Sequence, residues 1–203
     1  MKHLAASLAA ALAVAAAPAF AATVGQPAPD FTATDLAGKP VKLSDYRGKF
    51  VVLEWTNPEC PYVRRHYDSG NMPTLQKEAA SKGVVWLSIN SSSESSGEYY
   101  TPEQMARWQK QKASEPTATL LDENGKVGRA YKARTTPHMY IVDPQGKLMY
   151  AGAIDDKRSA SVADTKNANN YVRAALAEAL AGKPVTTSAT SPYGCSVKYG
   201  NAG

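Results

Sequence analysis

The sequence predicts one α/β domain built on a mixed sheet with helices on both faces, and three observations support this fold class. Strand-like and helix-like segments alternate, first as βαβα and then as ββα. The run 49–56 carries Val and Leu at successive positions, as a central strand buried on both faces requires. Asp143-Pro144-Gln145-Gly146 joins the last two strand-like runs as a hairpin turn. Together these features imply a sheet with its helices packed in layers against it.

The elements expected in the first half lead from extended chain to a central strand and its helix. In order, they are an extended segment at 24–31, a turn at 36–39, a short strand at 41–43, one helical turn at 44–48, a strand at 49–56, a helical segment at 61–82 and a strand at 84–89. We expect the helical segment to be interrupted around Gly70 to Pro73 and to end at Gly83.

The second half is expected to begin with a serine-rich loop and to end with a helix. Thr101 is the expected N-cap of a helix, because Pro102 suits its first position and Glu103 adds an acidic first turn. The remaining elements are a loop at 90–100, a strand at 118–121, a helical turn at 127–131, strands at 139–142 and 147–151, and an amphipathic helix at 169–180.

The first 21 residues, 1–21, have the parts of a secretory signal peptide. A short basic start precedes an apolar, alanine-rich run from Leu4 to Ala17, and Ala19-Phe20-Ala21 places small residues before a cleavage point. We therefore expect an exported protein, periplasmic or secreted, in a compartment where disulfides persist. An uncleaved membrane anchor is the alternative.

The exported part is expected to divide into a folded domain at 22–185 and a C-terminal tail at 186–203. Its length suffices for one full hydrophobic core, and the two cysteines of the chain are too few for a disulfide scaffold. The formal net charge is +5, but lysine and arginine are scattered without interleaved aromatic residues. We therefore expect no nucleic-acid partner and, after cleavage, no stable membrane insertion.

The two cysteines occupy different settings. Cys60 follows the apolar strand and directly precedes Pro61, which suits the first position of a helix. This places its sulfur at a helix N-terminus, where unpaired backbone N–H groups and the helix dipole favour the nucleophilic thiolate. Cys195 lies in the tail, which shows neither helical nor strand periodicity. We expect a mobile segment that carries the Cys195 thiol to its partner.

Three groups of residues carry a resemblance to a known family. Gly25-Gln26-Pro27-Ala28-Pro29-Asp30-Phe31, the strand-to-cysteine junction at Cys60, and Thr136-Pro137 ahead of a strand resemble the redoxin, or alkyl hydroperoxide reductase/thiol-specific antioxidant, branch of the thioredoxin-like superfamily. The chain is similar to a subgroup with Cys-Pro-Tyr-Val, Arg-Thr-Thr-Pro and a C-terminal Gly-Cys-x-x-Lys-Tyr, here Gly194 to Tyr199. The resemblance implies a thioredoxin-like three-layer α/β/α sandwich with a mixed central sheet and an N-terminal extension.

The chain departs from the two better-known patterns of this superfamily. A thioredoxin-type reductase has a second cysteine three residues after the first, where this chain has Val63. A typical peroxiredoxin has Thr or Ser three residues before its reactive cysteine, where this chain has Asn57, and an arginine where it has Pro137. The resemblance implies that Cys195 takes the place of the missing resolving thiol.

Other residues are candidates for supporting roles. By the resemblance, Thr136 and a cis Pro137 lie against Cys60 and shape the groove where a substrate disulfide docks. Arg134 is a candidate for the missing peroxiredoxin arginine, with Arg64 and Arg65 as alternatives.

Glu54 stands inside an otherwise apolar strand and allows two interpretations. It is either a buried carboxylate of raised pKa that relays protons, or a strand-end carboxylate paired with an arginine. Arg64, Arg65 and His66 follow Cys60 on its helix and are candidates for stabilising its sulfur, although at least one should face solvent. His66 and His138 have no familiar ligand spacing with Cys60, so no metal or other cofactor is expected.

These features predict an exported thiol-disulfide oxidoreductase. Cys60 is the expected nucleophile on a protein disulfide or a peroxide, and Cys195 resolves the product into an internal disulfide that an external dithiol reduces. Two alternatives stay open from the sequence. One is a peroxiredoxin-like antioxidant that reduces peroxides. The other is a non-catalytic binding module in which a Cys60–Cys195 disulfide is purely structural.

Overall fold

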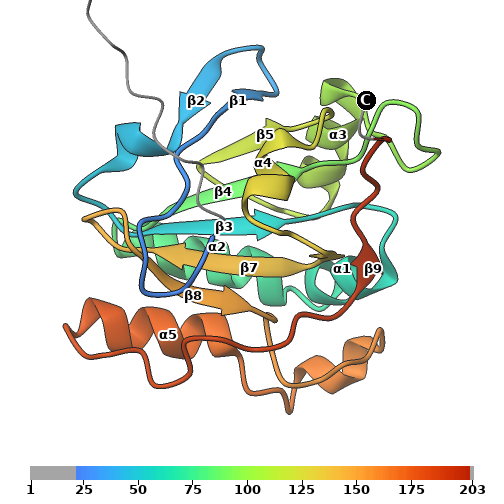
Figure 1. Cartoon of the computed structure of the whole chain (residues 1–203). Helices are drawn as coiled ribbons and strands as arrows, with labels where there is room; N and C mark the ends of the chain where they lie inside the picture. Colours follow the sequence, from blue (N-terminus) through green and yellow to red (C-terminus); the bar gives the residue numbers. More distant parts are fainter. Residues whose placement is uncertain (1–21, 202–203) are drawn as a thin grey trace, which may run out of the picture.

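The computed structural model describes residues 22–201, so the expected signal peptide at 1–21 lies outside the described residues. A seven-stranded sheet crosses the domain in the order β2-β1-β5-β4-β3-β7-β8 (Figure 1). The pairs β3–β4 and β4–β5 are parallel and the other pairs are antiparallel, which confirms the predicted mixed sheet. The strands are β1 (Thr32–Asp35), β2 (Pro40–Lys42), β3 (Val51–Trp55), β4 (Val85–Asn90), β5 (Ala118–Leu121), β7 (His138–Val142) and β8 (Leu148–Gly152).

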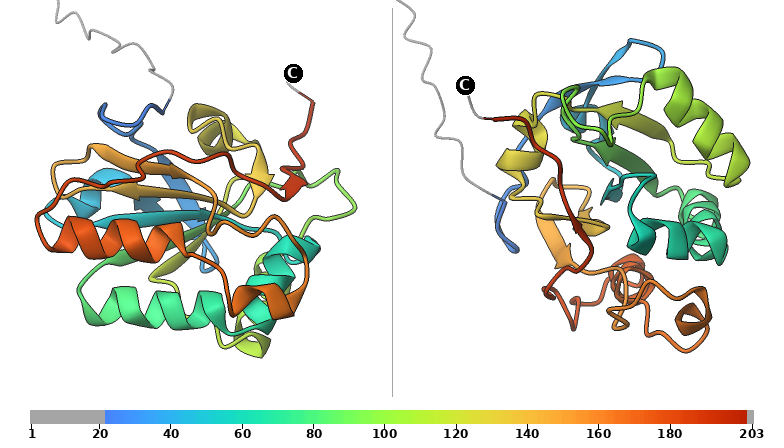
Figure 2. Two further views of the ribbon diagram at one scale, coloured as in Figure 1. Left: turned by 90° about the horizontal axis from the view of Figure 1, so that it is seen from below. Right: turned by 90° about the vertical axis from the view of Figure 1, so that its right-hand side faces the viewer.

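Helices cover both faces of the sheet, as the sequence predicts. They are η1 (Leu43–Tyr46), α1 (Pro61–Asp68), α2 (Asn71–Ser81), α3 (Pro102–Gln111), α4 (Lys126–Ala130), η2 (Val162–Thr165) and α5 (Tyr171–Leu180). Alternate side chains of the central strands divide into two hydrophobic clusters, one joined by α1, α2, α3 and α5, the other by η1 and α4. The right-hand view of Figure 2 shows α4 on the side of the sheet away from α2. This arrangement confirms the α/β/α layers.

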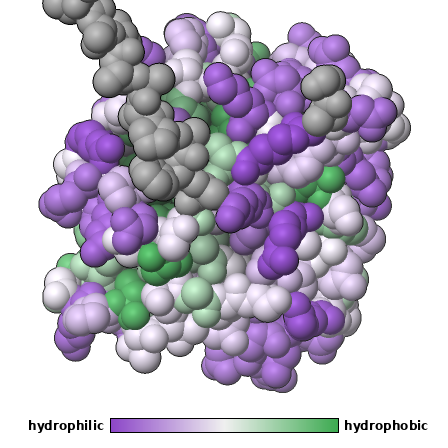
Figure 3. All heavy atoms as spheres, in the orientation of Figure 1, coloured by the Kyte–Doolittle hydropathy of each residue, from purple (hydrophilic) through white to green (hydrophobic). Residues whose placement is uncertain are grey.

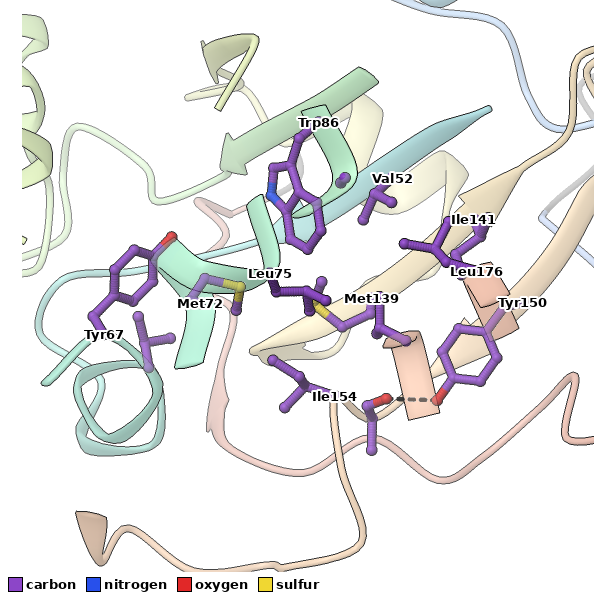
Figure 4. Packing of buried hydrophobic residues seen from close by; sticks show 14 of the residues in the cluster. Val52, Tyr67, Met72, Leu75, Trp86, Met139, Ile141, Tyr150, Ile154 and Leu176 are labelled. Atoms are coloured by element: carbon purple, nitrogen blue, oxygen red, sulfur yellow. Dashed lines mark hydrogen bonds between the residues drawn. The ribbon is translucent and has the colours of Figure 1, made fainter. Parts of the chain in front are cut away.

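The larger helical face holds the cluster that surrounds the candidate site. In Figure 4, Met72 and Leu75 of α2 and Leu176 of α5 meet side chains of the central strands, among them Trp86 and Met139. All five side chains are almost completely buried. Apolar surface removed from water is the main favourable contribution to folding, so this packing fixes α2 and α5 against the sheet.

The predicted helical segment 61–82 is two helices, and the break lies where the sequence predicts an interruption. Gly70 has a φ of 73°, in the left-handed region that favours glycine, and α2 begins directly after it. Gly83, with the same φ, follows the end of α2. The break leaves α1 as an eight-residue helix that begins at Pro61, with Cys60 as its N-cap residue.

The described part of the tail lies against the domain and forms a short strand, although the sequence shows no strand periodicity there. It first runs beside β8, where Thr190 N donates to Ala151 O (3.1 Å). It then forms β9 (Cys195–Ser196), which pairs antiparallel with β6 (Thr135–Thr136) in a separate two-stranded sheet. The red segment in Figures 1 and 2 follows this course. Pairings this short leave no alternation in the sequence, so periodicity cannot reveal them.

The face of the molecule drawn in Figure 3 is mostly polar. Figure 3 shows hydrophilic residues spread over the visible face, with hydrophobic residues only in small separate areas. Within residues 22–201, no helix has both the length and the apolar character that a membrane span requires.

We predict that Thr101→Ala lowers the free energy of unfolding by about 1 kcal/mol, the typical cost of losing an N-cap side chain. The Thr101 hydroxyl accepts a hydrogen bond from Gln104 N (3.3 Å), and Gln104 Oε1 accepts one from Thr101 N (2.8 Å), as a capping box requires. Urea denaturation measures the change, with Thr187→Ala at an exposed tail position as the matched control. Equal effects of the two substitutions would contradict the capping role.

Candidate active site

Cys60 lies at the N-terminal end of α1, where the sequence predicts it. It is the N-cap residue, and Pro61 occupies the first helical position. The preceding turn is fixed by Asn57, whose side-chain oxygen accepts a hydrogen bond from Glu59 N (2.8 Å) and whose carbonyl oxygen accepts one from Cys60 N (3.1 Å). Only 1% of Cys60 is exposed. The site therefore presents a covered thiol at a helix end where backbone N–H groups favour an anion.

The Thr136–Pro137 peptide bond is cis, as the resemblance implies, and Thr136 meets Cys60 directly. Cys60 Sγ donates a hydrogen bond to the Thr136 carbonyl oxygen at 3.0 Å. In the β6–β9 pairing, the residue opposite Thr136 is Cys195. One short strand pairing thus brings two cysteines that are distant in sequence to the same residue.

The surroundings of Cys195, Cys60 among them, change its acidity. Burial, a side-chain hydrogen bond with Cys60 and the negative charge of an ionised Cys60 together raise the pKa of Cys195 well above its usual value. Losing its proton is therefore unfavourable for Cys195 while it lies beside Cys60. A thiol that keeps its proton is a poor nucleophile, which disfavours Cys195 for the first attack.

Glu54 is a fully buried carboxylate on β3, and its partners are four neutral donors. Its oxygens accept hydrogen bonds from Tyr67 Oη (2.7 Å), Gln76 Nε2 (3.3 Å), Trp86 Nε1 (2.8 Å) and Ser88 Oγ (2.9 Å). Burial raises the pKa of Glu54, while these hydrogen bonds oppose the shift. Of the two interpretations that the sequence allows for Glu54, the structure agrees with a buried carboxylate. Within residues 22–201, the hydrogen bonds and ion pairs of Glu54 include no arginine, so the paired alternative does not fit.

The basic residues of α1 do not gather around Cys60. Arg65 is buried and forms an ion pair with Asp155 (2.7 Å). His66 is buried in the same polar region, and burial, together with the charge of Arg65, lowers its pKa to about 3. Arg64 is the exposed member of the three. Successive helix positions point in different directions, so adjacency in sequence did not place Arg65 and His66 at the sulfur.

The residues considered for peroxide activation are engaged elsewhere. Asn57 Nδ2 donates to Ser92 Oγ (3.0 Å) and to Glu98 (3.2 Å). Arg134 is exposed; burial and, secondarily, the Arg134 charge lower the pKa of His138 to about 3. Nothing in the described contacts joins the Arg134 side chain to Cys60. Residues 22–201 hold no group of three or more His, Cys, Asp or Glu side chains placed to bind a metal ion.

Sequence reasoning assigned no role to the two residues that precede Cys195. Tyr193 is buried, and its hydroxyl donates to Asp155 and accepts from Arg65 Nη1 (3.3 Å). Gly194 lies against the Thr136 carbonyl group with a φ of 135°. An aromatic residue in a polar tail, followed by glycine, is the signal that points to such an anchor.

Comparison with known proteins agrees with this geometry. The chain matches the AhpC/TSA family over residues 24–151. It is 35% identical over 135 residues to the thiol-disulfide oxidoreductase ResA of Geobacillus kaustophilus, across 63% of this chain and 68% of that protein. An uncharacterised conserved protein from the same organism has a similar structure, with a TM-score of 0.77 and 29% identity over 89% of this chain and 94% of that chain. The thioredoxin domain of a thiol-disulfide oxidoreductase from Bacteroides vulgatus matches with a TM-score of 0.52 and 22% identity over 72% of this chain and 97% of that chain.

The fold and these matches define a class of protein. A cysteine at a helix N-terminus, a cis proline beside it and a mixed sheet between helices are the features of a thioredoxin-like thiol-disulfide oxidoreductase, and the chain is an enzyme of this class. It belongs to the AhpC/TSA family of redoxins. The likeness to the Bacteroides vulgatus domain shows the fold alone.

We predict that the stability difference between the parent and Glu54→Gln depends on pH. Because the folded protein raises the pKa of Glu54, it binds this proton more tightly than the unfolded chain does. The stabilisation that this tighter proton binding gives is fully present below about pH 4.3, the pKa of glutamate in the unfolded chain. It is lost as the pH rises through the pKa of Glu54 in the folded protein. Urea denaturation between acidic and neutral pH should therefore show the parent losing stability relative to Glu54→Gln.

The matched control is Glu115→Gln, at an exposed position, whose difference from the parent should vary much less with pH. Comparing variants in this way cancels the titration of His66 and His138, which has the opposite sign. A stability difference for Glu54→Gln that does not change over this range would contradict a raised pKa.

Proposed function

We propose that this redoxin is an exported thiol-disulfide oxidoreductase in which Cys60 is the nucleophile and Cys195 is the resolving cysteine. The observation that carries the proposal is the pairing of Thr136 with Cys195 beside the hydrogen bond from Cys60 to Thr136 O. Export rests on the signal-peptide pattern at 1–21. The proposed partners are a protein disulfide or a peroxide as substrate and an external dithiol as reductant.

With a disulfide substrate, the reaction is two successive exchanges. The Cys60 thiolate attacks one substrate sulfur, forms a mixed disulfide and releases the other substrate sulfur as a thiolate. Cys195 then gives up its proton and attacks the Cys60 sulfur, which releases the second substrate thiolate and leaves a Cys60–Cys195 disulfide. The substrate gains two electrons and the enzyme loses two. An external dithiol returns them by the same chemistry in reverse.

The coupling between the thiols suits this order of events. Burial is the largest cause of the raised pKa of Cys195, and the negative charge of an ionised Cys60 adds to it. That charge disappears when Cys60 enters a mixed disulfide, so Cys195 becomes easier to deprotonate at the step that needs its thiolate. Lys198 acts in the same direction, because its charge lowers the pKa of Cys195.

Peroxide reduction is the second candidate, and one observation favours it. The Thr136 hydroxyl oxygen is buried and has no hydrogen-bond partner among the described residues, although the same residue contacts Cys60 through its carbonyl group. A free hydroxyl at this place can donate to a peroxide oxygen. Cys60 would then become a sulfenic acid with release of an alcohol or water, and Cys195 would condense with it to give the disulfide and water.

A purely structural disulfide is less well supported. The tail is held by contacts that do not involve sulfur, including the Tyr193 hydroxyl in its buried cluster and the donation from Tyr199 Oη to Ala133 O (2.8 Å). These contacts position Cys195 without a covalent bond. A thiol pair that is already aligned in this way favours reversible chemistry over a permanent staple.

We predict that mild oxidation converts the reduced protein to a form in which Cys60 and Cys195 are linked within one chain. Peptide mapping under non-reducing conditions should recover both cysteines in one linked fragment, because Cys195 lies opposite Thr136, whose carbonyl oxygen accepts the hydrogen bond from Cys60. Dithiothreitol should then release two thiols per chain, the full cysteine content. Two free thiols after oxidation, or linkage between chains, would contradict the resolving role.

We predict opposite behaviour of the two single-cysteine variants. Cys60→Ser should lose turnover with both insulin and hydrogen peroxide, since the nucleophile is absent. Cys195→Ser should complete the first step and accumulate a mixed disulfide with insulin or a sulfenic acid with peroxide. Mass spectrometry identifies the trapped adduct. The turnover rates of the parent protein with insulin and with hydrogen peroxide are then compared, and the faster reaction distinguishes disulfide exchange from peroxide reduction. A folded Cys195→Ser protein that fails at the first step would reverse the assignment.

A further inference from the structure

The open edge of β6 is covered by the chain's own C-terminus. β6 is not part of the seven-stranded sheet, and β9 is its partner. The pairing sets Thr135 opposite Ser196 and Thr136 opposite Cys195, and Val197 N donates to Arg134 O (3.1 Å) further along. A second polypeptide that adds a strand to an exposed edge would use the same backbone groups. With β9 in place, this edge is unavailable to it.

Tyr193 anchors the tail just before Cys195. The residue is 6% exposed, and its hydroxyl contacts Asp155, Arg65 and His66. Its ring also packs against Tyr62 of α1, with the ring centres 5.8 Å apart. Burial of a tyrosine whose hydroxyl is fully bonded makes this a strong point of attachment.

A second anchor follows Cys195. Tyr199 Oη donates to Ala133 O (2.8 Å), and the guanidinium of Arg129 lies 4.7 Å from the centre of the Tyr199 ring. Between the anchors, Lys198 O accepts a hydrogen bond from Ser93 N (2.8 Å), and Lys198 forms an ion pair with Glu98 (3.1 Å). The tail is thus fastened on both sides of Cys195.

Gly194 makes the close approach possible. A Cβ at this position would overlap the Thr136 carbonyl oxygen and lie 2.7 Å from its carbonyl carbon. The φ of 135° is also one that residues with a Cβ rarely adopt. Any larger residue would therefore separate the tail from the Thr136–Pro137 backbone.

We propose that residues 193–199 form a strap that competes with substrate polypeptides for the β6 edge and keeps Cys60 covered until it is displaced. The proposal rests on the proposed function only in that Cys60 is the thiol to be reached. Cys60 is 1% exposed in the structure with the strap docked, and its sulfur is hydrogen-bonded to Thr136 O as a thiol. A protein disulfide then reacts with the fraction of molecules in which the strap has left β6, and the observed rate falls in proportion to that fraction.

The test uses full-length reduced protein in a Cys195→Ser background, where Cys60 is the one remaining thiol. Gly194→Ala is added to release the strap, and Gly97→Ala is the matched control, because a Cβ at Gly97 meets open space at an ordinary φ. Two rates are measured: alkylation of Cys60 by iodoacetamide, and formation of the mixed disulfide with insulin. We expect Gly194→Ala to raise both by about tenfold or more, since a minor open state is populated at roughly 10% or less. The control should leave both rates near those of the background protein.

Two additional measurements guard against an effect of misfolding. Tyr199→Ala removes the second anchor without touching the groove, and should raise the same two rates while circular dichroism stays unchanged. A synthetic peptide of the 191–199 sequence, with serine in place of Cys195, should slow the insulin reaction of the Gly194→Ala protein. The same peptide with alanine in place of Gly194 should not.

The outcomes separate the strap from the proposed function. If Gly194→Ala changes neither the rate with insulin nor the rate with iodoacetamide, and the peptide has no effect, the strap proposal is overturned. Faster alkylation without any mixed disulfide would support the strap as a cover and overturn Cys60 as the nucleophile for disulfides.

Discussion

The contact between Cys60 Sγ and the Thr136 carbonyl oxygen, 3.0 Å apart, is the interaction on which the rest of the site depends. It ties the start of α1 to the segment that leads into β7. The same Thr136 residue pairs with Cys195 and receives the close approach of Gly194. The Cys60 sulfur, the Cys195 strand and the backbone edge of β6 therefore all depend on one residue, and a shift of Thr136 would change all three at once.

The buried cluster around Asp155 holds α1 and the tail in fixed positions relative to each other. Arg65 of α1 pairs with Asp155, and the Tyr193 hydroxyl of the tail bonds to both. Burying charges costs desolvation energy, so such a pair contributes little net stability, although removing one partner would be costly. Its contribution here is positional, because it joins a helix, a loop and the tail through groups that cannot separate without leaving a charge unpaired. The neutral His66 completes the cluster.

Glu54 is a second buried acid, and it differs from Asp155 in its partners. Asp155 has a cation beside it, whereas Glu54 has four neutral donors. Hydrogen bonds from neutral groups compensate only part of the loss of water, so burial keeps the pKa of Glu54 raised. Burial also raises the pKa of Asp155, and there the Tyr193 hydroxyl, the Lys157 backbone N–H and the Arg65 charge oppose the shift. Both acids therefore lie in surroundings that disfavour the charged form, and of the two only Asp155 has a cation beside it.

The sequence by itself determined the α/β class, the strand and helix order, the break at Gly70 and the place of Cys60 at the start of α1. These features depend on local patterns: apolar alternation, capping residues, and Pro and Gly at positions that need their backbone preferences. It also marked Glu54 as unusual, because a carboxylate inside an apolar strand stands out without any structure.

Only the tertiary structure decided where the tail runs, which side chains meet Cys60 and which do not. Arg65 is close to Cys60 in sequence, but it forms an ion pair with Asp155. Cys195 is distant from Cys60 in sequence, but it lies opposite Thr136, which contacts Cys60. The pairing of β6 with β9 involves two residues on each side and is held by anchors at Tyr193 and Tyr199. Contacts between segments so far apart are set by the packing of the whole domain, which no local pattern of residues encodes.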